Sequence, residues 1–305
     1  SIPLIGDISP DCSPQWLISL PWSKLACSLY QPKLLPQPPE HKGWSTLFGG
    51  TKGHSYEGSY IPDSNFSSDC GWHRTGIAGW TLFTQAISDS GHPKASHAHL
   101  DLGGFALYYK GFPVLVDTGR FDYTNSFISN YGRSGYGHNS LFINGFSPQG
   151  EKKFWMNPLY NKISNRVRIE KKLNSVHVLI SQNGFERIFR KRIVHQRHII
   201  LTKFSVEIND RINGKGTVDV QNFFHFGPNL TIQNENKNGI ELSNQMIFLK
   251  DSRAKINPNN DYSKSDNTGW MHPAYGVKVP IEKLELKIRM KLSGVIKNKL
   301  ILKNE

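Results

Sequence analysis

The sequence predicts an all-β protein made mainly of antiparallel strands, and three observations support this. In the segment 284–292, apolar residues alternate strictly with charged ones, which is typical of a strand with one face buried and one face in solvent. From about Gly43 onward, short apolar runs are separated by Gly, Asn, Asp and Ser, as strands are separated by turns. Beyond the N-terminal region, no amphipathic helical stretch of about twelve or more residues occurs.

The composition is that of a basic, folded protein. Its 305 residues suffice for one large all-β unit or two smaller domains. The net charge of +13 predicts an anionic partner. Because only 20% of the residues are charged and 11% are aromatic, a disordered basic tail is excluded. No run reaches the ~18 apolar residues of a membrane helix, and no signal-peptide pattern is present.

We interpret residues 1–44 as a proline-rich linker or entry segment and residues 45–305 as the β domain. Prolines throughout the first segment remove backbone donors and interrupt regular structure. The chain starts at Ser1, which suggests a piece of a longer protein, so the missing signal says little about location. The three cysteines form no CxxC pair, so a cysteine-built metal site is not expected.

Shorter patterns mark further strands and turns. Brief apolar alternation predicts strands around Val167/Ile169, Phe204/Val206/Ile208 and Val218/Val220. Asn-Gly pairs at 144–145, 183–184, 213–214 and 238–239 are candidate hairpin or loop turns. Residues 111–113 are expected to form a turn, after which the apolar run 114–116 returns beside the strand 105–109.

The densest group of reactive side chains is His97, His99 and Asp101. In an extended chain, residues at positions i, i+2 and i+4 project to the same face. Imidazole is both a common metal ligand and a common general base near neutral pH, so the spacing is compatible with a metal or catalytic site. Hydrogen-bonded histidines at the end of a sheet are the competing interpretation.

Asp117 and His138 extend this group if the two strands form a hairpin. Asp117 stands at the end of the returning strand, and His138 precedes the apolar run 141–143. Two histidines and one carboxylate are a common zinc set. Taken alone, Asp117 fits a turn-capping carboxylate and His138 fits a structural hydrogen bonder.

These residues lie in a block that closely resembles the central β-sandwich of the heparinase II/III-like polysaccharide lyases. The block comprises HAHLDLGGF at 97–105, GFPVLVDTG at 111–119, Tyr123 and YGRSGYGHNS at 131–140. Residues 6–11, GDISPD, resemble the family's entry into the sandwich, and residues 269–276, GWMHPAYG, resemble its late strand motif. The resemblance implies an N-terminal (α/α) toroid, a large antiparallel β-sandwich, and eliminative cleavage of uronic-acid-containing polysaccharides between them.

The resemblance also implies roles for individual residues. His97 matches the family's catalytic histidine, and His99, Asp117 and His138 match its metal ligands. One divalent ion is expected, and two imidazole ligands favour zinc over calcium. The ion is expected to brace the loop that carries His97. Because a zinc-bound histidine has lost the lone pair of a base, His97 is expected to stay unligated, while Asp101 is the rival ligand to Asp117.

Two further site residues are less specific. Tyr123 lies where some family members place a catalytic tyrosine, but Tyr131 and Tyr136 compete for this role, and a buried structural tyrosine is the alternative for each. Arg133 is a candidate to bind a uronate carboxylate through two hydrogen bonds. A structural ion pair is its alternative role.

Nothing in the sequence resembles the toroid helices, which in the family supply an Asn or His and a Tyr. We therefore expect only the sandwich half of a lyase here, partnered by the missing helical domain and weakly active or inactive without it. The alternative is a non-catalytic protein that binds acidic glycans or assembles surface polysaccharide. An acidic polysaccharide is the expected partner in both cases. The resemblance favours a periplasmic or extracellular location.

A basic run is the second feature that suggests an anionic ligand. Its members are Arg187, Arg190, Lys191, Arg192 and Arg197, with His195 and His198 interspersed. A solvated strand face is the plain interpretation, and an electrostatic track for an acidic glycan is the functional one. No nucleic-acid-binding motif is recognisable, so nucleic acid is not expected as a partner.

Overall fold

The computed structural model describes residues 66–67, 71–85, 99–149, 164–256 and 269–303. The predicted entry segment 1–44 and His97 therefore lie outside the described residues. Within the described part of the chain, no helix is both long enough and apolar enough to cross a membrane.

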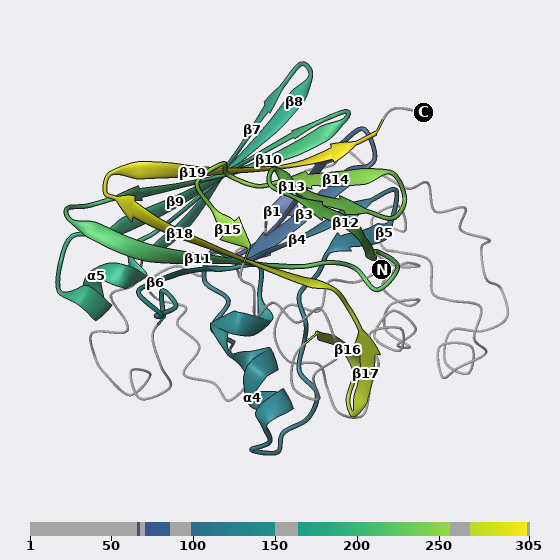
Figure 1. Cartoon of the computed structure of the whole chain (residues 1–305), viewed down its shortest axis with the longest axis horizontal. Helices are drawn as coiled ribbons and strands as arrows, with labels where there is room; N and C mark the ends of the chain where they lie inside the picture. The colour runs from purple at the N-terminus through teal and green to yellow at the C-terminus, as the bar shows by residue number, and fades with distance from the viewer. Residues whose placement is uncertain (1–65, 68–70, 86–98, 150–163, 257–268, 304–305) are drawn as a thin grey trace, which may run out of the picture.

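The described residues form three antiparallel sheets and one hairpin (Figure 1). A five-stranded sheet has the order β1 (Phe66–Ser67), β2 (Trp72–Ile77), β3 (Trp80–Gln85), β4 (Phe105–Tyr109), β5 (Phe112–Leu115). A four-stranded sheet has the order β15 (Lys255–Ile256), β18 (Lys283–Lys291), β11 (Thr217–His225), β6 (Leu141–Ile143). The largest sheet has eight strands in the order β12 (Ile232–Asn236), β13 (Gly239–Leu242), β14 (Met246–Leu249), β19 (Gly294–Leu302), β10 (Ser205–Asn213), β9 (Val194–Thr202), β8 (Ser175–Gln182), β7 (Asn165–Lys172).

Short elements lie outside these sheets. They are the helix α4 (Phe127–Arg133), the 3-10 turn η2 (Gly135–Gly137), the helix α5 (Gly184–Phe189) and the hairpin of β16 (Trp270–Ala274) and β17 (Val277–Pro280). In the view of Figure 1, the eight-stranded sheet lies above β11 and β18, whereas α4 and the β16–β17 hairpin lie below them.

The two smaller sheets join into one layer. A β-bridge pairs Leu115 at the end of β5 with Phe226 just after β11. Backbone hydrogen bonds from Val116 N to His225 O (2.8 Å) and from Gly227 N to Val114 O (3.0 Å) extend this junction. The eight-stranded sheet faces this layer, so the fold is an antiparallel β-sandwich, as the sequence predicted.

The core fills the space between the two layers. In β8 and β9 every second residue is buried, as expected for strands with one face on a core. The inward apolar residues of these two strands belong to one cluster that also takes members from β4, β11 and β18. Burying an Ile, Leu or Phe side chain fully stabilises the fold by roughly 1.5–3 kcal/mol, so this cluster is the main source of stability.

The predicted strands are present, with differences at their ends. β18 has the alternating burial expected from its sequence over most of its length. Val218 and Val220 are buried in β11, whereas Val167 and Ile169 are half-buried because β7 is an edge strand. Phe204 precedes β10 and is 49% exposed, so only the later part of its predicted strand is regular.

The turns show why Asn-Gly is favoured. At 144–145 both residues have positive φ, 48° and 81°, and Ile143 and Phe146 pair across the turn as in a tight hairpin. The pair at 238–239 connects β12 to β13. The pair at 183–184 instead begins α5.

The basic run is not a single strand face, so that interpretation was wrong. Arg187 lies on α5, and Arg190, Lys191 and Arg192 are exposed in the link to β9. Arg197 is completely buried on the inner face of β9. The run therefore crosses a helix, a loop and a strand, and its charges do not share one environment.

We predict that Asp251 contributes stability that is lost in acid. Its carboxylate accepts hydrogen bonds from Arg253 Nε (2.9 Å), Arg253 Nη2 (2.8 Å) and Lys297 N (3.0 Å). Burial opposes ionisation, but these bonds lower the pKa of Asp251 from 3.8 to about 2. A lowered folded-state pKa stabilises the protein above pH 3.8, and this stabilisation is lost as the pH falls toward about 2.

Asp251→Asn should therefore lower the free energy of unfolding at pH 6 and should change it much less at pH 2. Urea denaturation of both proteins at the two pH values measures this difference. An equal loss at both pH values would show that the ionised form of Asp251 is not the stabilising one.

Candidate functional site

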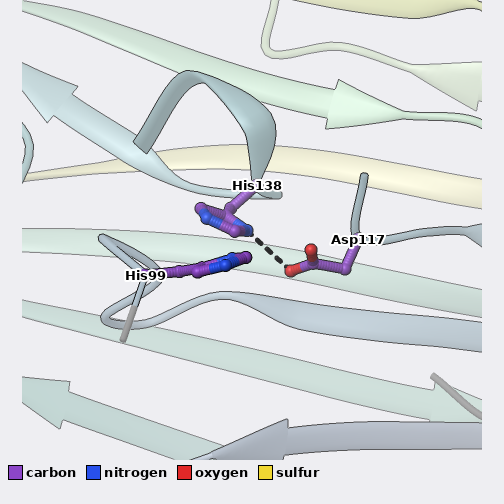
Figure 2. Close-up of side chains that lie close together, drawn as sticks. All are labelled: His99, Asp117 and His138. Carbon is purple, nitrogen blue, oxygen red and sulfur yellow. Dashed lines mark hydrogen bonds and ion pairs between the residues drawn. The ribbon is translucent and has the colours of Figure 1, made fainter. Parts of the chain in front are cut away.

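Three buried polar side chains converge near the junction of the two smaller sheets. His99 is 2% exposed, Asp117 6% and His138 0%. One potential ligand atom from each lies within 4.8 Å of the others. Figure 2 shows the two imidazoles and the carboxylate facing one another. The structure thus brings together the three residues that the sequence singled out as a metal set.

Local structure explains how residues so far apart in the sequence meet. The turn at Lys110 and Gly111, with φ of 47° and 81°, folds β5 back on β4, so the residues before β4 and after β5 lie at the same end of the hairpin. His99 comes before β4, and Asp117 follows β5. His138 is the residue at which η2 ends. The expected hairpin is therefore present.

The segment before β4 is not the extended strand that the sequence suggested. Residues 101–104 form a turn in which Gly104 N donates to Asp101 O (2.7 Å). The regular strand begins only at Phe105. His99 and Asp101 therefore do not lie on a regular strand, and the expected alignment of His97 with them lies outside the described residues.

Electrostatics within the cluster favour a cation. His138 Nδ1 lies 2.6 Å from Asp117 Oδ2, and Asp117 Oδ1 accepts from Gly119 N (3.0 Å). Burial alone would lower the pKa of His138, but the charge and hydrogen bond of Asp117, together with the charge of Asp101, raise it. Burial raises the pKa of Asp101, while His138 and His99 oppose this change.

The donor set fits a divalent transition ion. When Nδ1 of a neutral His138 donates to Asp117, its Nε2 carries a lone pair. That Nε2 is buried and has no hydrogen-bond partner among the residues that the structure describes. A buried nitrogen lone pair beside a second imidazole and a carboxylate is the arrangement that zinc prefers.

The backbone that carries His99 is clamped from two sides. Leu100 N donates to Arg133 O (2.8 Å) at the end of α4. The side chain of Gln149 accepts from Leu102 N (3.0 Å) and donates to His99 O (3.3 Å). These hydrogen bonds fix the direction of the segment 99–102, which the structure does not assign to a strand. Sequence reasoning did not identify Gln149, since a lone Gln gives no signal in the sequence.

Asn139, next to His138, joins three strands. Its side-chain amide donates to Phe105 O (2.9 Å) and Val116 O (3.0 Å). Its Oδ1 accepts from His225 N (2.8 Å) at the end of β11. One amide therefore ties together the start of β4, the end of β5 and β11, which surround the cluster.

A buried ion pair supports both histidine segments from the opposite layer. Arg197 Nε and Nη2 donate to Asp210 (2.7 and 3.2 Å), and both side chains are completely buried. Arg197 Nη1 reaches across the core to Gly103 O (2.9 Å) and Asn139 O (2.6 Å). Asp210 also accepts from His195 Nε2 (2.7 Å) and Asn222 Nδ2 (2.9 Å). Although burial opposes ionisation, Arg197 and His195 lower the pKa of Asp210.

The three candidate tyrosines have different environments. Tyr123 is 37% exposed, stacks on Tyr275 with ring centroids 5.9 Å apart, and carries the guanidinium of Arg120 over its ring at 4.1 Å. Tyr131 is buried, and its hydroxyl lies 3.1 Å from His225 Nε2. Burial raises the pKa of Tyr131. Tyr136 packs on Phe142 and Phe223.

Of the two remaining candidates, the structure describes Arg133 but not His97. Arg133 is the last residue of α4 and is half-buried, and its backbone carbonyl accepts the bond from Leu100 N. His97 lies outside the described residues. The same is true of the N-terminal motif at 6–11.

Comparisons with known proteins agree with the fold. The family model described as "Heparinase II/III-like, C-terminal" matches residues 62–299. The fold is similar to that of the heparan sulfate lyase HepC from Pedobacter heparinus (TM-score 0.65, 15% identity), with 99% of this chain and 44% of HepC covered. It is also similar to the heparinase III-BT4657 gene product (TM-score 0.61, 14% identity), with 98% and 43% covered.

At these identities the two solved structures show a shared fold and no more. The chain spans less than half the length of either protein. Among curated proteins, none matches the sequence.

We predict that Arg197→Met lowers the free energy of unfolding by about 3–5 kcal/mol, because it leaves the Asp210 charge buried without its main partner. Urea denaturation near neutral pH measures the loss. Arg211→Met is the matched control, since Arg211 lies exposed on the adjacent strand and should change stability by no more than ~0.5 kcal/mol. Equal losses for the two variants would show that the buried pair does not support the fold.

Proposed function

The chain belongs to the heparinase II/III-like family through its C-terminal domain, and on that premise we propose that it is the β-sandwich portion of a polysaccharide lyase. The proposed substrate is an acidic polysaccharide that contains uronic acid, and the proposed reaction is β-elimination. The observation that carries the proposal is the buried cluster of His99, Asp117 and His138, held by clamps from three directions. We take residues 45–305 as the domain and 1–44 as its entry segment.

The reaction requires three kinds of group. The C5–H bond breaks as a base takes the proton, the C4–C5 double bond forms, and the C4–O bond breaks as an acid protonates the departing oxygen. The uronate carboxylate must be neutralised while negative charge develops at C5. We assign the base to His97 and carboxylate binding to Arg133, whose planar guanidinium suits two parallel hydrogen bonds.

We assign proton transfer at the departing oxygen to Tyr123. Support comes from its exposure, which leaves the side chain within reach of a ligand, and from its position six residues after Asp117. Tyr131 is buried and bonded to His225, and Tyr136 packs on two phenylalanines, so both fit structural roles better.

We propose that His99, Asp117 and His138 hold one divalent ion, zinc by its donor set. When bound, the ion supplies a fixed positive charge and a rigid crosslink between the segment before β4 and the segments that follow β5 and η2. His97 lies two residues from His99, so a fixed His99 limits where His97 can point. The imidazole of His97 does not bind the ion, so its lone pair stays available to take the proton.

We predict that metal content separates the two neighbouring histidines. Elemental analysis of purified His99→Ala should find the metal lost, because one of three ligands is removed, whereas His97→Ala should retain it. Asp117→Asn should also lose the metal, and Asp101→Asn should retain it. Circular dichroism shows whether each variant is folded. Metal retained by folded His99→Ala and lost from His97→Ala would reverse the assignment.

We predict that the full-length natural protein containing this sequence releases unsaturated uronate product. The assay follows the absorbance of that product with heparan, chondroitin, alginate and polyuronate substrates. Removing the base in His97→Ala should slow the preferred reaction on the order of 10²–10⁴-fold. Lys172→Ala, an exposed change on β7, is the matched control and should leave the rate unchanged. Absence of product from every substrate while the metal is present would refute the lyase function.

A further inference from the structure

A basic groove lies on the protein away from the histidine cluster. It has a volume of about 910 Å³, and its lining residues are Lys191, Arg192, Val194, Gln196, Asn213, Gly214, Lys215 and Gly216. They come from the α5–β9 link, the start of β9, the end of β10 and the loop before β11. The groove therefore sits where three consecutive strands begin or end.

The charge in the groove has one sign. Lys191, Arg192 and Lys215 are exposed, and the lining includes no carboxylate. Within the described part of the chain, these three side chains form no ion pair. Arg211 lies directly opposite Gln196 in the β9–β10 pairing and is exposed, which places a fourth cation beside the groove. Unpaired cations gathered around a concave surface attract an anionic ligand.

The groove and the histidine cluster lie at opposite ends of β11. Gly216 lines the groove immediately before β11, whereas His225 ends the strand beside Asn139 and the cluster. The nine residues of β11 make eight steps of roughly 3.3 Å, so its two ends lie about 26 Å apart. A ligand in the groove therefore does not contact the cluster directly, although a long chain can reach both.

We propose that this groove is a second binding site for an acidic polysaccharide chain, which holds the chain at a distance from the proposed catalytic residues. The proposal deepens the proposed function, on which it rests for its ligand class. The cations would bind carboxylate or sulfate groups of the chain. The amides of Gln196 and Asn213, which also line the groove, suit sugar hydroxyls.

The test is binding of a size-defined heparin oligosaccharide to the full chain, measured by calorimetry at several salt concentrations. The triple variant Lys191→Glu/Arg192→Glu/Lys215→Glu replaces the three cations of the groove with carboxylates and so reverses its charge. The matched control Arg166→Glu/Arg168→Glu/Lys172→Glu makes the same charge change on exposed positions of the edge strand β7. Circular dichroism and thermal unfolding show whether both variants fold.

The heparin affinity of the groove variant should be lower than that of the unaltered chain by a factor on the order of ten or more. Its affinity should also depend less steeply on salt, because fewer counterions are released. The heparin affinity of the control variant should stay within about threefold of that of the unaltered chain. Equal losses in both variants would overturn the proposal, since net charge alone would then explain binding. Single-stranded RNA of equal charge that binds more tightly than heparin, with the same loss in the groove variant, would also overturn it.

The binding experiment is independent of catalysis. If the groove variant loses heparin binding while the full-length protein forms no unsaturated product, the second site stands and the lyase function fails.

Discussion

The buried ion pair of Arg197 and Asp210 is the interaction on which the arrangement of the site depends. Two charges without access to water are costly, and this cost is tolerated only when the pair and its remaining donors are fully bonded. Here the remaining guanidinium donor bonds to Gly103 O and Asn139 O, which lie beside the two histidine-bearing segments. The eight-stranded sheet therefore positions the cluster through one side chain.

In this arrangement one layer of the sandwich carries the histidine cluster and the other layer supports it. The eight-stranded sheet contributes no residue to the cluster, yet it supplies the ion pair that fixes the loops of the opposite layer. Asn139 then links β4, β5 and β11 around these loops. Loops held by buried polar bonds keep reactive side chains in place more precisely than loops held by apolar contacts alone, because the bonds are directional.

Local patterns in the sequence predicted most of the fold, and long-range polar bonds explain what they missed. Strict alternation located β18, and the glycine turn at 110–111 was enough to bring Asp117 near His99. The turn at 101–104 was missed, because its Asp-Leu-Gly-Gly sequence was read as part of the adjacent strand. The burial of Arg197 was detectable: it has the same parity in β9 as the apolar Ile199 and Leu201, so alternation places it on the inner face.

Asp210 and His138 are both completely buried, but the described residues bond to them to different extents. Every oxygen of Asp210 accepts hydrogen bonds, and the lowered pKa of this carboxyl indicates a charge fully compensated by protein groups. His138 is equally buried, but its Nε2 has no such partner among the described residues. Leaving a buried polar atom unbonded costs about 1–3 kcal/mol, and a ligand that bonds to it removes the cost. The charge of Asp210 is therefore satisfied within the fold, whereas His138 keeps a nitrogen to which the proposed ion would bond.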